Sequence, residues 1–494
     1  MDPNLNRARD LAEDEIILGK MGYRQELSRR MGGFSNFAIS FSIICILAGC
    51  ITSFPSGFCT VGGASIGLGW PLVCLFSMIV AATMAHIASA FPTAGGLYHW
   101  ASILGGRGLG WATAWFNMAG LITVAAAVNA GAYDFMAAAF NFPTFGHPQA
   151  VRILGIAFIT VSHAVFNHKG IRLTTLLTDF SGYLILLVSL ALTAALLWNS
   201  PHYEFARLTT FSNYSGIPAD DPVIPSSKSL GWLFALGFLL PAYTLTGFDA
   251  SAHTSEETVG AGRNVPRGIV RSVWISSLFG WIMLCAIVLA IPNMDAAAAQ
   301  GNNAFPWIMK SVLPSSLSLL LLVGISVAQY FCGLACLTSG SRMAFAFARD
   351  GGLPGSKYLR RVSPTARTPS VAIWFVAILA VSFIIFLPYT AIAAVCAVFL
   401  YISYVLPTAA GFYAWGRSWT EPGPWSIGAW YRPLAVLAMV GCGGLIVIGM
   451  QPPNQQAAWI VGGMLVAMVI VWFGFERKRF QGPPLPARRS SPAA

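Results

Sequence analysis

Stretches of about 20 consecutive, mostly apolar residues recur along the chain, and each is long enough to cross the hydrocarbon core of a bilayer as a helix. About twelve such stretches are present. Their apolar residues run continuously instead of alternating with polar ones, which favours helices over the strands of a membrane barrel. The chain is 56% hydrophobic and only 10% charged, a balance far from that of soluble domains. We therefore predict an all-α integral membrane protein.

The basic residues predict how the spans are oriented. If the N-terminus faces the cytosol, the segments between spans alternate across the bilayer, and most of the 29 Lys and Arg residues fall on the cytosolic side. The exceptions are Arg152, Arg207, Lys228 and Lys310. An even number of spans returns the C-terminus to the cytosol. The net charge of +11 is then explained by topology, and no nucleic-acid partner is expected.

No soluble domain can be separated from this pattern. We expect a cytosolic N-terminal tail over residues 1–32, a transmembrane domain over residues 33–476 and a cytosolic C-terminal tail over residues 477–494. The protein would be a multi-pass protein of the cell membrane with the lipid bilayer around it. The nine cysteines are odd in number and lie in or beside apolar stretches, which predicts free, buried thiols and no metal site.

The sixth span is interrupted at membrane depth by Thr246, Gly247, Phe248 and Asp249. A backbone that unwinds in hydrocarbon leaves polar groups unpaired, which costs several kcal/mol per group unless protein, water or a ligand satisfies them. The interruption therefore predicts a cavity that holds a guest.

The first span is interrupted in a similar way, by the small and polar run from Ala48 to Ser53. It lies five spans before the sixth, and interruptions at corresponding positions of two halves indicate a transporter built from inverted repeats. Each glycine alone could instead be a notch that lets two helices approach closely. The pairing of the two interruptions favours the repeat.

Three motifs carry a more specific signal. They are FPTAGGLYHW from Phe91 to Trp100, GFDASAHTSEET from Gly247 to Thr258 followed by NVPRGI from Asn264 to Ile269, and SRMAFAFARDGGLP from Ser341 to Pro354. In sequence and order they resemble the amino acid–polyamine–organocation (APC) transporter superfamily. The details are most similar to the amino acid/choline transporter branch, which includes GABA and choline permeases of fungi. The resemblance extends from about Gly32 to Arg477.

This resemblance implies a 5+5 inverted repeat with broken helices 1 and 6, followed by two C-terminal helices. It also implies a substrate pocket between spans one, three, six, eight and ten. Backbone amides of the first break would bind a substrate carboxylate, helped by the positive end of a half-helix, and they belong to Ala48, Gly49, Cys50 and Ile51. Carbonyl groups of the sixth span would accept hydrogen bonds from an ammonium group, and they belong to Tyr243, Thr246 and Gly247. Phe248 would be an aromatic lid able to attract a cation.

The acidic residues in and near the spans are the other candidates. An acid at membrane depth is costly, so Asp249 is expected to be a counter-ion for the substrate or a proton carrier. It could also cap the second half of the broken helix. Asp179 in the fifth span is a candidate for gating or coupling. Glu256 and Glu257 could form an inner gate with Arg263, Arg267 and Arg271, or could simply be solvated charges.

The function that we predict is secondary active transport of an amino acid or a related amine such as GABA by alternating access, with no cofactor. Coupling to H⁺ or Na⁺ is open, because the lysine that some proton-coupled relatives carry in the fifth span is missing. Alternatives are a choline or polyamine permease, a passive channel, or a membrane-embedded enzyme. The enzyme would rest on the G-x-S-x-G match from Gly63 to Gly67, which has neither the preceding strand nor the nearby base that it needs. The sequence leaves the oligomeric state open.

Overall fold

The computed structural model describes residues 3–140, 142–200, 202–386 and 389–484. The ends of both predicted tails, residues 1–2 and 485–494, lie outside the described residues. Across the described part, ten helical segments are long and apolar enough to cross a membrane. Two shorter apolar helical segments, Leu230–Thr244 and Ser370–Phe386, complete the set of about twelve spans that the sequence predicts. The same part contains no β-strand, only two isolated bridges. The predicted all-α membrane fold is confirmed.

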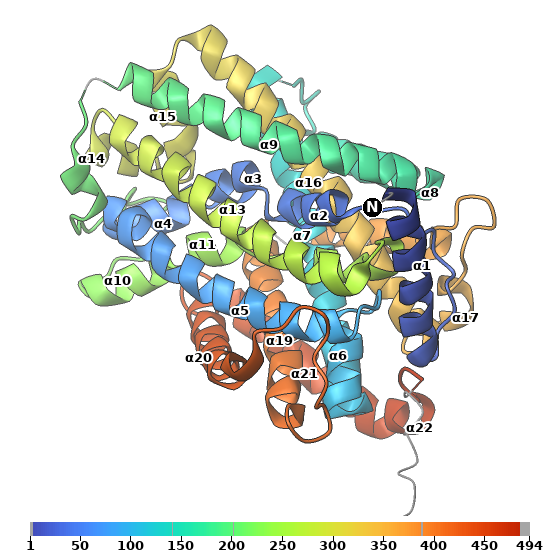
Figure 1. The fold of residues 1–494 in the computed structure, drawn as a ribbon. Helices are drawn as coiled ribbons and strands as arrows, with labels where there is room; N and C mark the ends of the chain where they lie inside the picture. Colours follow the sequence, from blue (N-terminus) through green and yellow to red (C-terminus); the bar gives the residue numbers. More distant parts are fainter. Residues whose placement is uncertain (1–2, 141, 201, 387–388, 485–494) are drawn as a thin grey trace, which may run out of the picture.

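The spans follow one another along the chain (Figure 1). Span one consists of α2 (Gly33–Ile44), α3 (Ile46–Thr52) and α4 (Phe54–Val61), and span six of α10 (Leu230–Gly237), α11 (Leu239–Thr244) and α12 (Ala250–His253). Spans two to five are α5 (Trp70–Ala90), α7 (Arg107–Phe140), α8 (Pro148–Lys169) and α9 (Ile171–Asn199). Spans seven to twelve are α13 (Ala261–Ala290), α16 (Ser315–Arg349), α18 (Ser370–Phe386), α19 (Tyr389–Ala414), α20 (Tyr431–Gly449) and α21 (Gln455–Val471).

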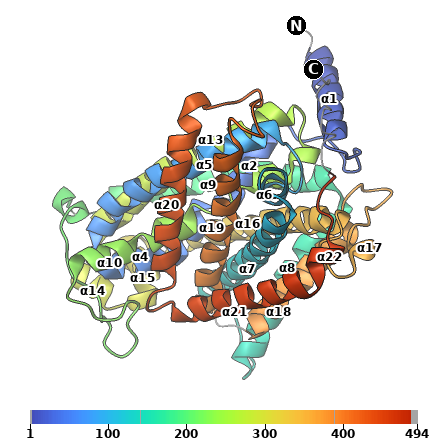
Figure 2. The ribbon, with the colours of Figure 1, turned by 90° about the horizontal axis from the view of Figure 1, so that it is seen from below.

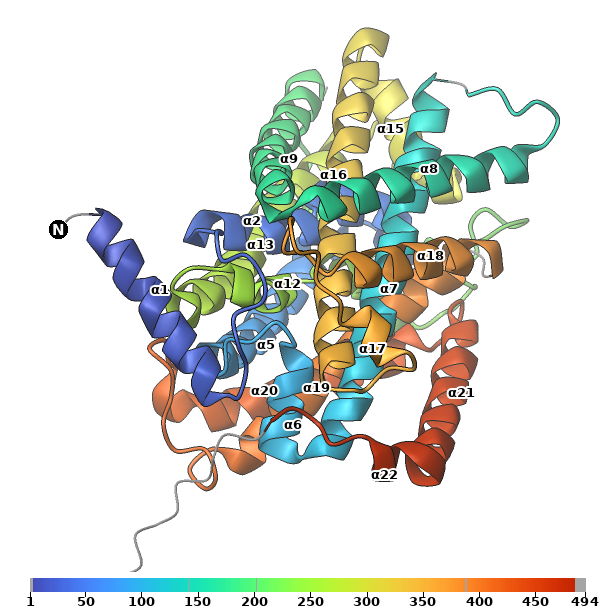
Figure 3. The ribbon, with the colours of Figure 1, turned by 90° about the vertical axis from the view of Figure 1, so that its right-hand side faces the viewer.

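Short helices lie at the two ends of the bundle. The N-terminal face, as we name it, carries α1 (Pro3–Lys20), α6 (Leu97–Gly105), η3 (Ser255–Glu257) and α17 (Ser356–Leu359). The opposite face carries α4, α14 (Met294–Ala298), α15 (Ala304–Val312) and the loop of residues 202–229. Figure 1 shows α1 and α17 at one end of the molecule, far from α14, and Figure 3 views the molecule from the end that carries α1 and α17. Helices α20 and α21 run along the outside of the bundle (Figure 2), and about half of their residues are exposed.

The break in span six lies where the sequence predicts it. Helix α11 ends at Thr244, and α12 begins only at Ala250. Gly247 has a φ of +85°, a backbone conformation that glycine adopts without steric cost. A Cβ at this position would also lie 2.1 Å from Cγ2 of Ile43 in span one. The two broken spans therefore touch at the break itself.

The break in span one lies earlier than predicted. It falls at Cys45, with φ 29° and ψ 83°, and a second irregularity follows at Ser53. The run from Ala48 to Ile51 belongs to helix α3. Gly49 in that run is a packing notch, because a Cβ there would lie 2.8 Å from the Cα of Thr244 in span six. Its small size thus serves a close helix contact, and does not mark the point of unwinding.

This contact predicts a stability effect. Gly49→Ala would place a methyl group against the backbone of Thr244, and overpacking of this kind costs about 1–3 kcal/mol. We expect a lower Tm for the purified protein in detergent, measured by intrinsic fluorescence. Gly444→Ala is the control, since a Cβ at Gly444 meets nothing within 4 Å, and its Tm should not fall. An unchanged Tm for Gly49→Ala would contradict the close contact.

Candidate functional site

Asp249 lies at the centre of the molecule, completely buried at the start of α12. Its Oδ1 accepts a hydrogen bond from the Tyr404 hydroxyl at 2.8 Å. Its Oδ2 accepts one from Nδ2 of Asn117 at 2.8 Å and lies 3.2 Å from Nε2 of His253. Both oxygens are therefore held by side chains from spans three, six and ten. This is how the protein tolerates an acid at a depth where an unpaired charge would be very costly.

Asp249 does not cap the half-helix that follows it. Its side chain makes no capping hydrogen bond to the backbone of α12. The capping role that the sequence left open is therefore absent from this structure. The carboxylate instead joins side chains of spans three, six and ten, and its role as a counter-ion or proton carrier stays a prediction.

The unwound backbone of span six is satisfied by neighbouring side chains. The Gly247 amide donates to the Tyr404 hydroxyl at 2.9 Å, and the Phe248 carbonyl accepts from the Ser40 hydroxyl at 2.8 Å. Ser40 also accepts a hydrogen bond from the Ser251 amide at 2.9 Å. Phe248 is buried, with its ring 4.9 Å from that of Tyr404. In this structure, side chains of spans one and ten satisfy the backbone groups that, from the sequence, we expected a guest to satisfy.

A cavity of about 350 Å³ lies next to this region, toward the opposite face. Its polar lining includes Thr52 and Ser53 from span one and Tyr243 from span six. Tyr401 from span ten lines it as well, one helical turn before Tyr404. Of the nine predicted substrate-binding residues, Tyr243 is the one that lines the cavity. Thr246 lies just behind it, and its hydroxyl donates to the Tyr243 carbonyl at 2.9 Å.

The predicted anion site in span one is not formed. The amides of Ala48 and Gly49 both donate to the Cys45 carbonyl, at 2.7 and 2.9 Å. Cys50 and Ile51 lie further along the same helix α3 and are buried. These four amides are therefore part of regular helix, because the backbone unwinds at Cys45 and not after Ala48.

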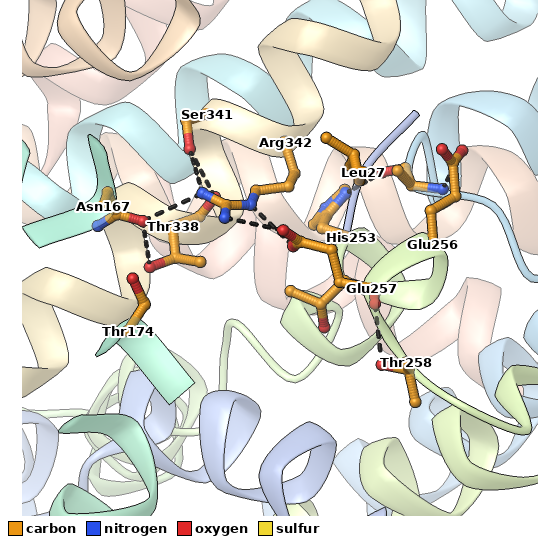
Figure 4. A network of polar contacts seen from close by, with 12 residues as sticks. Leu27, Asn167, Thr174, His253, Glu256, Glu257, Thr258, Thr338, Ser341 and Arg342 are labelled. Carbon is orange, nitrogen blue, oxygen red and sulfur yellow. Dashed lines mark hydrogen bonds and ion pairs between the residues drawn. The ribbon is translucent and has the colours of Figure 1, made fainter. Parts of the chain in front are cut away.

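Glu256 and Glu257 form two ion pairs near the N-terminal face, and their role as a gate stays a prediction. Glu256 binds both guanidinium nitrogens of Arg349, at 2.8 and 2.9 Å. Glu257 binds Arg342 in the same two-pronged way, at 2.9 and 3.0 Å. Arg342 also donates to Oδ1 of Asn167 at 3.1 Å (Figure 4). Both carboxylates are completely buried, so they are not solvated interfacial charges.

The partners of these carboxylates differ from the prediction. Arg263 lies within 3.9 Å of Asp10 and Glu13 of helix α1, and Arg267 and Arg271 are exposed. Proximity in sequence was a poor guide here, because α13 turns its arginines away from the preceding turn. A usable signal was present in span eight. An arginine such as Arg342 inside a long apolar helix requires a buried counter-ion.

The N-terminal segment, by which we mean residues 21–31, covers these ion pairs. The Arg29 guanidinium donates to the carbonyls of Ser255 and Thr258, at 2.9 and 2.5 Å. The amides of Arg30 and Met31 both donate to the Glu257 carbonyl. Nothing in the sequence of the polar tail indicated this docking.

Asp350, directly after span eight, fastens the same segment. Its Oδ2 accepts hydrogen bonds from the hydroxyls of Tyr23 and Tyr98, at 2.8 and 2.9 Å, and lies 3.0 Å from Nε2 of His99. Burial alone would raise the pKa of Asp350. The hydrogen bond and charge of His99, the Arg349 charge and the Tyr23 hydrogen bond outweigh burial and hold this pKa below its ordinary value.

Asp179 does not join the other predicted residues. It is half-buried in α9, and its Oδ2 accepts a hydrogen bond from the Ser35 hydroxyl at 2.9 Å. Ser35 lies at the start of span one, away from the break. Asp179 therefore links spans one and five near the N-terminal face, and its role in gating or coupling stays a prediction.

The enzyme alternative finds no support in the local geometry of its motif. Ser65 is buried at the start of a short π-helix, Ser65–Gly69, that leads into α5. Its hydroxyl shares a hydrogen bond of 2.7 Å with Thr60. A nucleophile elbow needs a strand before the serine and an exposed hydroxyl, and this serine has neither.

The buried ion pair predicts strong energetic coupling between Glu257 and Arg342, so that the effects of substituting them on stability do not add. Removing one partner leaves an uncompensated buried charge, which costs about 3–5 kcal/mol. We expect Glu257→Gln to lower the free energy of unfolding and to make the N-terminal face accessible to thiol reagents at an introduced cysteine. Adding Arg342→Met should restore part of the lost stability, as a double-mutant cycle would measure. Strictly additive losses would contradict the pairing.

The contacts of Asp350 predict how the N-terminal segment is held. Asp350→Asn removes the charge that three donors share, so backbone amides of residues 21–31 should exchange faster with deuterium, measured by mass spectrometry. The depressed pKa means that this stabilisation is present above the pKa of the unfolded chain and is lost as the pH falls through the folded value. Glu26→Gln is the control, because the Glu26 side chain is exposed. Equal exchange in both variants would contradict the fastening role.

Comparison with known proteins places this geometry in a family. The model of the family described as amino acid permease matches residues 31–475. The amino-acid permease BAT1 of Arabidopsis thaliana is 31% identical over 95% of this chain and 96% of its own length, and a homologue in Oryza sativa is 31% identical over 94% of both chains. The GABA-specific permease of Saccharomyces cerevisiae is 26% identical over 95% of this chain and 86% of its own length. The chain therefore belongs to the amino acid permease family of the APC superfamily, a family of transporters and not of enzymes.

Proposed function

We propose that this protein carries an amino acid or a related amine across the cell membrane by alternating access, with both termini in the cytosol. The observation that carries the proposal is the broken span six. Its Asp249 binds Tyr404 of span ten, and Tyr401, one helical turn before Tyr404, lines a cavity. The cavity is lined by span one, span six and span ten. Breaks of this kind near mid-membrane are where secondary transporters bind their substrates.

The molecule has a cavity toward the opposite face and buried ion pairs at the N-terminal face, and this asymmetry supports alternating access. Loop residues 221–224 and Asn302 of the opposite face line the cavity, so it lies on that side of the molecule. The N-terminal face is closed by the pairs Glu256–Arg349 and Glu257–Arg342, and the segment around Arg29 covers them. With the proposed orientation, this conformation is closed toward the cytosol.

The cavity suits a small zwitterion or amine. Its volume of about 350 Å³ is at the small end of the range for ligand pockets. The hydroxyl groups of Thr52, Ser53 and Tyr401 lie among apolar side chains such as Leu239 and Val398. Asp249 would attract an ammonium group, and the carbonyls of Tyr243, Thr246 and Gly247 would complete its shell when the break rearranges. Phe248 would then close over the bound substrate.

The proposal is tested by uptake into proteoliposomes. The purified full-length chain would be reconstituted and offered a panel of labelled amino acids, GABA, choline and polyamines under imposed H⁺ or Na⁺ gradients. We expect saturable uptake of one amino acid or amine class, with counterflow. Flux that does not saturate and shows no counterflow would indicate a passive channel. Uptake of choline or polyamines alone would favour the alternative permease.

Asp249→Asn should abolish most of this uptake. The substitution removes the charge of a completely buried carboxyl group at the break of span six and keeps the size of the side chain. We expect at least a tenfold lower initial rate for the preferred substrate. Asp134→Asn is the matched control, since Asp134 lies on the same span as Asn117 but pairs with Arg152 at the exposed surface. Wild-type uptake by Asp249→Asn would contradict the assigned role.

A further inference from the structure

Each ring nitrogen of His253 has a hydrogen-bond partner. One partner is a carbonyl oxygen, which can only accept, and the other is an ionisable carboxyl group. Nδ1 lies 3.2 Å from the Ala94 carbonyl oxygen, and Nε2 lies 3.2 Å from Oδ2 of Asp249. His253 is completely buried in α12, four residues after Asp249.

These partners determine how many protons the pair holds. A carbonyl oxygen accepts and never donates, so Nδ1 must carry a hydrogen. Nε2 then has a hydrogen only if the ring is an imidazolium, and otherwise presents a lone pair. A lone pair facing an ionised carboxylate would be a repulsive contact between two acceptors. One proton therefore lies between Nε2 and Oδ2, carried either by His253 or by Asp249.

The other groups around Asp249 and His253 do not supply the proton that lies between Nε2 and Oδ2. Asn117 from α7 donates to the same Oδ2, and Tyr404 from α19 donates to Oδ1. Helix α2 contributes only neutral polar groups here, such as Ser40, which contacts the backbone. The nearest charged groups are the paired Glu256 with Arg349 and Glu257 with Arg342, and His99 is engaged with Asp350. The arginines of α13 are exposed.

One residue, Ala94, joins Asp249 and His253 to the ion pairs of the N-terminal face. The Ala94 carbonyl accepts from His253, and the Ala94 amide donates to Oε1 of Glu256 at 3.1 Å. Glu256 in turn holds Arg349. A change in the hydrogen bonding of His253 would therefore act directly on the turn that positions the closing ion pair.

We propose that Asp249 and His253 form a proton-binding site that couples transport to a proton gradient. The site holds one dissociable proton in the conformation closed at the N-terminal face. Release of that proton leaves a neutral His253 with hydrogen on Nδ1 and an ionised Asp249, so the net charge of the pair changes from zero to minus one. The repulsion that follows between Nε2 and Oδ2 separates the pair and disturbs the Ala94 turn. The coupling part of this proposal rests on the proposed transport function.

The proton itself is tested without transport. Nitrogen-15 NMR of histidine-labelled protein in lipid nanodiscs, with the signal assigned through His253→Gln, reports whether Nδ1 and Nε2 are protonated. Infrared difference spectra against Asp249→Asn report whether a protonated carboxyl is present. At neutral pH we expect either a doubly protonated His253 ring or a protonated Asp249. A ring with one hydrogen beside an ionised carboxylate would overturn the proposal, whether or not the protein transports anything.

The coupling is tested in the proteoliposome assay. Wild-type protein should accumulate substrate under a pH gradient, acid on the side of the opposite face, and should do so without Na⁺. In His253→Gln, the ratio of gradient-driven accumulation to substrate counterflow should fall at least tenfold. His163→Gln is the matched control, because His163 is also completely buried within a span but lies in α8, away from Asp249. Its ratio should equal that of the wild type.

The outcomes separate the two proposals. Counterflow of a substrate with no response to pH, together with an unprotonated pair in the spectra, would overturn the proton site and leave the transport function standing. A protonated pair in a protein that moves none of the panel would support the site and overturn the transport function. An equal loss of ratio in His163→Gln would show that any buried histidine matters for folding, and would contradict a specific role for His253.

Discussion

The structure depends on the requirement that a backbone unwound within a bilayer must find hydrogen-bond partners inside the protein. At the break in span six these partners are the Tyr404 hydroxyl for the Gly247 amide and the Ser40 hydroxyl for the Phe248 carbonyl. Because both partners lie on other spans, the break can persist only while spans one, six and ten stay packed together. Any movement that opens the site must exchange these bonds for others, and a substrate's polar groups could provide them.

The same requirement explains the buried charges. Glu257 and Arg342 are each completely buried, and their two-pronged contact with added support from Asn167 offsets part of the cost of desolvation. Such pairs contribute little net stability compared with apolar side chains of the same size. Their value lies in being separable, since Glu257 lies in η3 after span six and Arg342 lies on span eight. A closure built from them can be broken without unfolding either helix, which a purely apolar seal between the same spans would resist.

Much of the fold was predictable because it follows from the bilayer. The spans, the break at Gly247 and the buried state of Asp249 all follow from apolar length and the cost of polar groups in hydrocarbon. The break in span one was misplaced by three residues, because a small residue such as Gly49 serves close packing as readily as unwinding. The partners of Glu256 and Asp249 could not be deduced either. They lie on spans eight, three and ten, and one sequence does not specify how distant helices rotate against each other.

The position of His253 connects these two requirements. It lies between the carboxylate that span six holds at mid-membrane and the turn whose Ala94 amide binds Glu256. The proposed substrate site and the ion pairs near the N-terminal face thus share one short chain of hydrogen bonds, with an ionisable group at its middle. Two sites are coupled when an element between them has two arrangements and both sites bias it. A histidine with an acceptor on each side has two such arrangements, with and without its second hydrogen, so the proposed coupling requires no larger rearrangement to begin.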